Sequence, residues 1–197
     1  MPEPNPPENF STTLLSMLFS LAREDRFRKV VLGVPVTVAD GTKPLGDIFP
    51  LSHATGIWMC RDLWSVWPGG QGATEEDRNL YCGKKPDVWC DDERHVLFIE
   101  NKVGGGRKLE SQENRYLGFL RKERLHHKKK GLFYGVPEGW TVNPSCEWLD
   151  FIRTPDVSVV RGLLKWDSAL AGLITDLFNV PEWFATKLPN RIGNQYL

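Results

Sequence analysis

Two acidic side chains and one lysine are spaced as in a hydrolytic centre. Glu100-Asn101-Lys102 ends a mostly apolar run that begins at residue 95. Asp87 begins a shorter apolar segment, and the polar residues 91–94 separate that segment from the run. The carboxylates are hard oxygen ligands that suit Mg²⁺ or Mn²⁺, and the main-chain carbonyl of Asn101 is placed to supply another oxygen. Lys102 adds a positive charge that can orient water or stabilise charge developing on a phosphate. These residue types are compatible with a divalent-metal site in which Asp87, Glu100 and Asn101 are the ligands.

Two predicted strands position these side chains. Residues 87–90 and 95–103 are largely apolar and flank a polar turn at 91–94, which is typical of a β-hairpin. Side chains alternate along a strand, so Glu100 and Lys102 point to the same face. The aspartate that starts the first strand lies beside them, because paired strands are about 5 Å apart. Alternating charges are also typical of a solvated strand face, and spacing alone does not separate the two interpretations.

The remaining elements predict an α/β fold with a small central mixed sheet flanked by helices, in one domain of residues 1–197. We expect helices at 9–22, 108–126 and 168–178, and strands at 30–38, 131–136 and 157–164. Pro35 predicts an edge or a bend in the first of these strands. Residues 39–85 are rich in Gly, Pro and Trp, and they predict an irregular insertion of loops and short elements. The inner face of the first helix is predicted to hold Leu14, Leu15, Met17, Leu18 and Leu21.

Composition narrows the class of protein. With 197 residues, of which 41% are hydrophobic and 25% charged, the chain is not of the disordered class. It has no apolar run long enough for a membrane span and no basic segment before an apolar stretch near Met1, so we expect neither a membrane partner nor a signal peptide. None of its four cysteines lies in a C-x-x-C pair, which argues against zinc-finger and thioredoxin-type sites. A reduced, cytoplasmic protein is the expectation.

The formal net charge is zero, but one segment is strongly positive. Residues 102–130 hold 10 basic and 3 acidic residues, against 10 and 15 in residues 1–101. Local fields steer polyanions, so this segment predicts nucleic-acid contacts. The predicted contact residues are Lys108, Arg115, Arg121, Lys122, Lys128, Lys129 and Lys130. Cations near a helix C-terminus are also favourable without any ligand, so a solvated helix end remains the other interpretation.

The motifs together resemble a known family. Pro86-Asp87 followed by Glu100-Asn101-Lys102 resembles the signature of the PD-(D/E)XK nuclease superfamily. Further segments resemble a bacterial and phage branch of that superfamily: Glu8 to Leu15 (ENFSTTLL) at the first helix, Gln112 to Tyr116 (QENRY) on the helix after the lysine, and Lys165-Trp166-Asp167 before the last helix. The resemblance spans nearly the whole chain. It departs at residues 39–85, which are longer and richer in Trp than the family pattern.

The resemblance implies a restriction-endonuclease-like αβββαβ core and a catalytic set of Asp87, Glu100 and Lys102. It also implies that Glu8 completes the acidic cluster, and that Gln112 contacts the lysine, a water or the substrate backbone. The alternative for Glu8 is a favourable carboxylate near a helix N-terminus, and for Gln112 an ordinary exposed helix residue. Tyr116 is expected to pack in the core.

The predicted function is therefore a Mg²⁺- or Mn²⁺-dependent nuclease, a DNA endonuclease in a defence, mobile-element or repair setting. A homodimer fits this prediction, because a double-strand break needs two active sites. One alternative is a catalytically silent nuclease-like fold that binds another protein through the tryptophans of residues 39–85. A second alternative is a non-catalytic nucleic-acid binder that uses residues 102–130.

Overall fold

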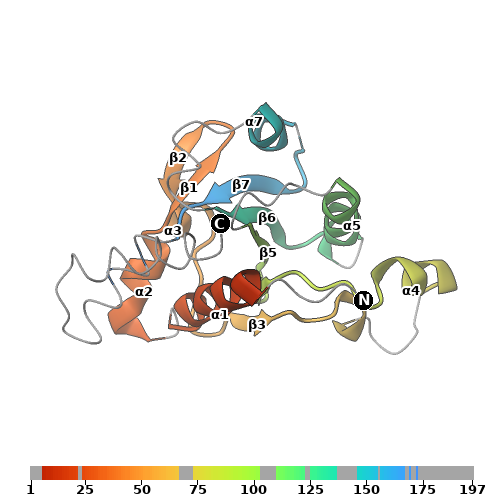
Figure 1. The fold of residues 1–197 in the computed structure, drawn as a ribbon, viewed down its shortest axis with the longest axis horizontal. Coiled ribbons are helices and arrows are strands. Elements are labelled where there is room, and N and C mark those ends of the chain that lie inside the picture. Colours follow the sequence, from red (N-terminus) through yellow and green to blue (C-terminus); the bar gives the residue numbers. More distant parts are fainter. Residues whose placement is uncertain are drawn as a thin grey trace.

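A seven-stranded mixed sheet forms the centre of the computed structural model, which describes residues 6–21, 24–66, 73–102, 110–122, 125–136, 146–154 and 156–166, and single residues 169 and 172. The strands are β1 (Pro35–Val38), β2 (Gly41–Pro44), β3 (Gly56–Met59), β4 (Val88–Asp91), β5 (His95–Asn101), β6 (Lys129–Gly135) and β7 (Val160–Leu164). Their order across the sheet is β2-β1-β7-β6-β5-β4-β3 (Figure 1). The three central strands β5, β6 and β7 are parallel, and all other neighbours are antiparallel.

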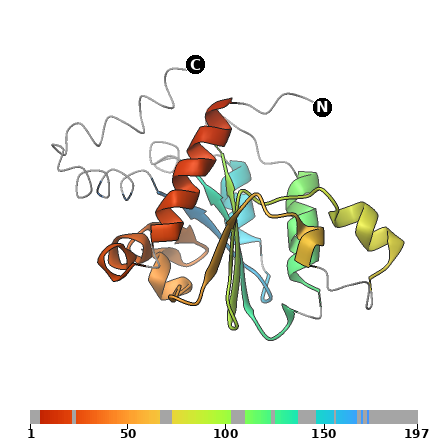
Figure 2. The ribbon, with the colours of Figure 1, turned by 90° about the horizontal axis from the view of Figure 1, so that it is seen from below.

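Helices cover both faces of this sheet. They are α1 (Pro6–Leu21), α2 (Asp25–Leu32), α3 (Leu45–Ile48), the 3₁₀ helix η1 (Leu63–Val66), α4 (Glu75–Tyr81), α5 (Glu110–Leu120) and α7 (Cys146–Arg153). Figure 2 shows the sheet nearly edge-on, with α1 on one face and α5 on the other. α5 lies between the parallel strands β5 and β6 in the chain, as a crossover between parallel strands requires. None of the helices in the described ranges is long and apolar enough to cross a membrane.

Each face of the sheet has its own hydrophobic core. Leu15 and Leu18 of α1 pack with Ile99 of β5 on one face, and Tyr116 of α5 packs with Phe98 on the other. All of β5 after His95 is buried, so the interpretation of this strand as a solvated face is wrong. Parallel strands covered on both faces are nearly continuous apolar runs, and the charged end of β5 is therefore an exception that needs an explanation.

The hairpin prediction is confirmed, with β4 and β5 antiparallel and Asp91 opposite Val96. The helix predicted at 108–126 forms as α5, but it ends at Leu120, six residues before the predicted end. There the chain turns toward β6. The predicted helix 168–178 lies outside the described residues except for positions 169 and 172.

Other sequence predictions need correction. Residues 30–32 belong to helix α2 instead of a strand, because the buried residues Phe27 and Val31 are four positions apart and share one helix face. Pro35 stands at the first position of β1, which is an interior strand; that position tolerates proline. Met17 is 57% exposed, because it lies on the opposite side of α1 from the buried residues Leu15 and Leu18.

The sheet is also larger than predicted. Residues 39–85 do contain short elements, but two of these are the strands β2 and β3, which form the two edges of the sheet. Neither strand shows a clear alternation of buried and exposed residues, so neither could be read from the hydrophobic pattern. Helix α7 was not predicted.

Candidate active site

The end of the β4–β5 hairpin gathers the predicted acids and the lysine. Val88 of β4 pairs with Ile99 of β5, so one further step along the antiparallel ladder places Asp87 opposite Glu100. The main-chain N–H of Asn101 donates a hydrogen bond to Asp87 Oδ2 at 2.7 Å, which holds this carboxylate against the end of β5. Asp87 and Glu100 are therefore neighbours at the open end of the β4–β5 hairpin, away from its turn.

Glu100, Lys102 and Gln112 form a buried polar cluster. Lys102 Nζ lies 3.0 Å from Glu100 Oε1, and the two side chains are only 7% and 5% exposed. The side-chain amide of Gln112 donates to the same carboxylate oxygen at 2.7 Å, while its own oxygen lies 3.5 Å from Lys102 Nζ. The interpretation of Gln112 as an ordinary exposed helix residue is wrong, since it contacts both charged groups.

Tyr116 supports the cluster from one turn further along α5. Its ring packs in the core against Phe98, with ring centroids 5.9 Å apart, as predicted. Its hydroxyl group lies 3.2 Å from Glu100 Oε2, 2.8 Å from the Lys85 carbonyl oxygen and 3.1 Å from Gln112 Nε2. Tyr116 thus joins α5, the loop before β4 and the end of β5.

Burial and charge act in opposite directions on this cluster. Burial raises the pKa of the Glu100 carboxyl above its ordinary value, although the Lys102 charge and the hydrogen bonds from Lys102, Gln112 and Tyr116 lower it. Burial and the neighbouring Glu100 carboxylate raise the pKa of the Tyr116 hydroxyl, which therefore stays protonated and able to donate. Removal of Lys102 would therefore raise the pKa of Glu100 further, because burial would then be opposed only by the hydrogen bonds from Gln112 and Tyr116.

Cys60 borders the same acids. Its main-chain N–H donates to the Asp87 carbonyl oxygen at 3.0 Å, and its backbone adopts a φ of +47°, which is uncommon for a residue with a side chain. Burial first, and then the charges of Asp87 and Glu100, raise the pKa of its thiol. Burial and these two charges therefore both favour the neutral thiol.

The side chain of Asn101 points to the other face of the sheet, as the alternation along β5 predicts. Trp166 Nε1 donates to Asn101 Oδ1 at 3.2 Å. A Cβ atom added at Gly135 on β6 would lie 3.1 Å from that amide oxygen and 3.3 Å from the Trp166 ring, so a larger residue there would press on both side chains. Only the main chain of Asn101 is directed toward the acidic cluster.

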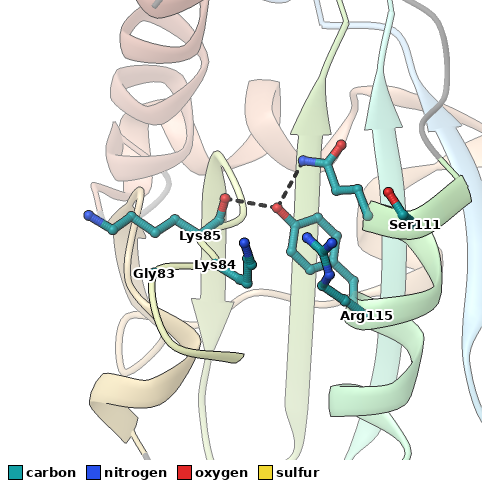
Figure 3. A pocket seen from close by; sticks show the side chains of 7 residues that line it. Gly83, Lys84, Lys85, Ser111 and Arg115 are labelled. Atoms are coloured by element: carbon teal, nitrogen blue, oxygen red, sulfur yellow. Dashed lines mark hydrogen bonds between the residues drawn. The ribbon is translucent and has the colours of Figure 1, made fainter. Parts of the chain in front are cut away.

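A pocket of about 280 Å³ opens beside the cluster (Figure 3). It lies between the loop that leads into β4 and the first turns of α5, and it is lined by Gly83, Lys84, Lys85, Ser111, Gln112, Arg115 and Tyr116. We call it the cationic pocket. Figure 3 shows Lys84 and Arg115 between the loop and α5, whereas the Lys85 side chain extends away from α5.

The donor set suits a hard divalent cation. Asp87 and Glu100 supply carboxylate oxygens and Asn101 supplies its carbonyl, without a sulfur or imidazole ligand. No group of three acidic, His or Cys side chains lies close enough to share a metal within the described ranges, so waters would have to complete the coordination. Mg²⁺ tolerates this, because it usually keeps several waters and binds through one or two carboxylates.

Most of the predicted nucleic-acid residues do not lie at this site. Lys129 and Lys130 pair with His95 and Val96 at the beginning of β5, whereas Glu100 is near its end. These positions are five and four residues from Glu100 along the strand, which corresponds to roughly 13–17 Å at about 3.3 Å per residue.

Several of these cations also have acidic or carbonyl partners. Ion pairs join Arg121 to Asp156, Lys122 to Asp77 and Lys128 to Asp91, while Lys129 Nζ donates to the Ile48 carbonyl oxygen. Lys130 is buried. Of the predicted set in the described residues, Arg115 alone lines the cationic pocket.

Two predicted residues cannot be placed in the site. Glu8 belongs to helix α1, but its side chain lies outside the described part of the structure. Lys108 also lies outside the described residues.

Sequence reasoning missed Lys84 and Lys85, and it treated Tyr116 as packing only. The signal for the lysines was present in the sequence: Gly83-Lys84-Lys85 directly precedes Pro86-Asp87. The charge count favoured residues 102–130, whereas Lys84 and Lys85 lie in residues 1–101, where acidic residues outnumber basic ones.

Comparison of the chain with protein-family models, with curated proteins and with solved structures finds no match in any of the three. The resemblance to PD-(D/E)XK nucleases therefore stays a prediction, and the site has to be judged on its geometry.

Proposed function

We propose that the chain is a divalent-metal-dependent nuclease whose active site is formed by Asp87, Glu100 and Lys102. The observation that carries this proposal is the meeting of two carboxylates and a buried lysine at the end of one hairpin, with Lys102 Nζ 3.0 Å from Glu100 Oε1. A lysine and a glutamate buried together in a sheet of apolar strands are costly for folding, and such costs are typical of functional sites.

The order of elements also supports the proposal. Helix α1 and the antiparallel strands β3, β4 and β5 are followed by α5 and by β6, which is parallel to β5. With α2, β1, β2, α3, η1 and α4 left aside, this order is compatible with the αβββαβ core that the resemblance implies, and it supports the proposal without establishing that core. In this proposal, the hairpin β1–β2 and strand β7 extend the core on its other side.

Lys102, Gln112 and Tyr116 have different roles in the proposed hydrolysis of the phosphodiester bond. Water attacks the phosphorus atom, one P–O ester bond breaks, and the leaving oxygen takes a proton, which yields a phosphomonoester and an alcohol. Lys102 orients the attacking water and stabilises the negative charge that develops on the phosphate. Gln112 and Tyr116 are positioning residues, because they hold the Glu100 carboxylate and the Lys102 ammonium group in place.

A divalent cation would be held by Asp87, Glu100 and the carbonyl of Asn101, where it would act as a Lewis acid on the phosphoryl oxygens. It would share the Glu100 carboxylate with Lys102 and Gln112, which both hydrogen-bond to it. DNA as the substrate, a cytoplasmic location and a homodimeric state remain predictions from the sequence.

Cleavage of nucleic acid with Mg²⁺ or Mn²⁺ tests the proposal. We expect the wild-type protein to cut at least one of single-stranded DNA, duplex DNA and RNA, and the Lys102→Ala variant to leave that substrate intact. Wild-type protein that leaves all three intact with both metals would contradict the proposal.

One observation favours a catalytically silent binding module as the second candidate. Glu100 Oε1 already accepts hydrogen bonds from Lys102 and Gln112, and the Tyr116 hydroxyl lies 3.2 Å from Oε2, as in a purely structural cluster. Calorimetric titration with Mn²⁺ separates the two candidates. The nuclease binds Mn²⁺ with a heat that Asp87→Ala or Glu100→Ala abolishes, whereas the silent module gives no such heat.

A further inference from the structure

The cations of the cationic pocket differ in their partners from three of the predicted contact residues. Arg121, Lys122 and Lys128 form ion pairs with carboxylates. For the side chains of Lys84, Lys85 and Arg115, by contrast, no carboxylate of the described residues lies within ion-pair distance. Their positive charge is therefore available to a ligand.

The pocket shares a wall with the candidate active site. Gln112 and Tyr116 line the pocket and also hydrogen-bond to Glu100. The Lys85 carbonyl oxygen accepts a hydrogen bond from the Tyr116 hydroxyl at 2.8 Å, which holds the loop of residues 83–85 against α5. The pocket therefore adjoins the side chains that hold Glu100 in place.

The chemistry of the lining favours a phosphate group. The guanidinium group of Arg115 can bind phosphate through two parallel hydrogen bonds, and Lys84 adds a compact positive charge. The Ser111 hydroxyl group and the Gln112 side chain offer neutral hydrogen-bonding groups at the same place. A volume of about 280 Å³ is at the small end of ligand pockets, and it suits one sugar-phosphate unit of a longer chain.

We propose that the cationic pocket binds a backbone phosphate of the nucleic-acid substrate, next to the phosphodiester that lies at Glu100 and Lys102. Arg115 and Lys84 hold this phosphate and so set the position of the strand relative to the catalytic groups. The inference deepens the proposed function and rests on it for the identity of the substrate. It moves the main nucleic-acid contact from residues 121–130 to the loop before β4 and the first turns of α5.

Binding without cleavage tests this inference separately from the proposed function. A labelled 20-nucleotide oligonucleotide, as single-stranded DNA, duplex DNA and RNA, is titrated with the full chain in EDTA while fluorescence anisotropy is measured at several NaCl concentrations. We expect Arg115→Gln and Lys84→Gln each to weaken binding about threefold to tenfold, and to lower the slope of log Kd against log[salt] by about 1.

Two variants serve as matched controls. Arg94→Gln removes an exposed arginine at the turn before β5, at the other end of the hairpin, and Lys29→Gln removes an exposed lysine on α2. Both should bind the oligonucleotide as the wild type does, and circular dichroism confirms that all four variants are folded. If all four variants lose affinity equally, the effect is one of overall charge and the pocket has no special role.

Other outcomes also decide the question. Wild-type affinity and an unchanged salt slope for Arg115→Gln and Lys84→Gln would overturn the proposal, as would wild-type protein that binds none of the three oligonucleotides. Inorganic phosphate is tested in a competition arm. If millimolar phosphate binds in a way that Arg115→Gln abolishes while oligonucleotide affinity is unaffected by that change, the pocket is a small-anion site and the proposal fails. Because no metal is present, a failure of cleavage alone does not affect these results.

Discussion

Trp166 Nε1 donates a hydrogen bond to Asn101 Oδ1 at 3.2 Å, although the two residues are 65 positions apart in the chain. Both are buried, and Asn101 is the residue between the glutamate and the lysine of the candidate site. Trp166 packs in the core on the α1 face, so this hydrogen bond ties the backbone of the site to the hydrophobic cluster behind it. The main chain of Asn101 is thereby held in place from the face opposite to Glu100.

Replacement of Trp166 by phenylalanine should weaken this anchor. We expect Trp166→Phe to lower the free energy of unfolding by about 1–3 kcal/mol, since a buried amide oxygen loses a donor. Urea denaturation followed by circular dichroism measures the change. Trp58→Phe is the matched control, because Trp58 is 37% exposed, and it should change stability less. Equal losses in the two variants would show that the Trp166–Asn101 hydrogen bond has no special weight.

The Glu100–Lys102 pair should behave as a coupled buried pair. Lys102→Met alone leaves a buried carboxylate without its cation, and Glu100→Gln alone leaves a buried cation, so each should cost about 3–5 kcal/mol of unfolding free energy. The double variant removes both charges and should recover most of that loss. A double-mutant cycle by urea denaturation in EDTA measures the coupling. Additive losses would mean that the two groups do not interact.

Stability should fall in acid through Asp156. Burial raises the pKa of its carboxyl, but hydrogen bonds from Ser158 and Arg121 and the Arg121 charge outweigh burial and hold it below the ordinary value. A lowered pKa in the folded state contributes stability that is present above the unfolded-state pKa of about 3.9 and is lost as the pH falls below it. We therefore expect Asp156→Asn to be about 2 kcal/mol less stable than wild type at pH 7, and this difference to shrink steadily as the pH falls from about 4 to 2.

Thermal or urea unfolding between pH 2 and pH 7 measures this difference. Thr154, near Asp156, provides a control: its hydroxyl group donates only to the Asp150 carbonyl oxygen one turn earlier, so Thr154→Val should shift stability by the same amount at every pH. A difference between wild type and Asp156→Asn that does not change with pH would contradict the assignment.

The parts of the fold that a local pattern determines could be predicted from the sequence. The β4–β5 hairpin has an apolar run on each side of a polar turn, and the alternation along β5 correctly placed Glu100 and Lys102 on one face. The prediction failed where tertiary contacts decide. Strand β3 has no alternating pattern, and it is a strand because it pairs with β4 along its length. Val30 and Val31 have β-branched side chains, but with Leu32 they complete an amphipathic helix.

The acids and the lysine of the candidate site were predictable because their order along two strands fixes their spacing. The cations of the pocket were not, because a charge count along the sequence ignores where acidic partners lie. Arg121 and Lys128 meet Asp156 and Asp91, which are distant in sequence, so the most basic segment has less charge available to a ligand than the count indicates. Lys84, in an acidic half of the chain, is brought next to Arg115 only by the packing of α5 beside β4.

The single-turnover rate of phosphodiester cleavage tests the central claim most directly. With enzyme in excess over a labelled oligonucleotide and with Mn²⁺ present, we predict that Lys102→Met lowers the rate at least about 100-fold, the size expected when a group that stabilises the developing charge is removed. Its affinity for the oligonucleotide in EDTA should stay near that of the wild type, and Arg94→Gln should cleave at the wild-type rate. A Lys102→Met variant that is folded, binds the substrate and cleaves it as fast as the wild type would contradict the account.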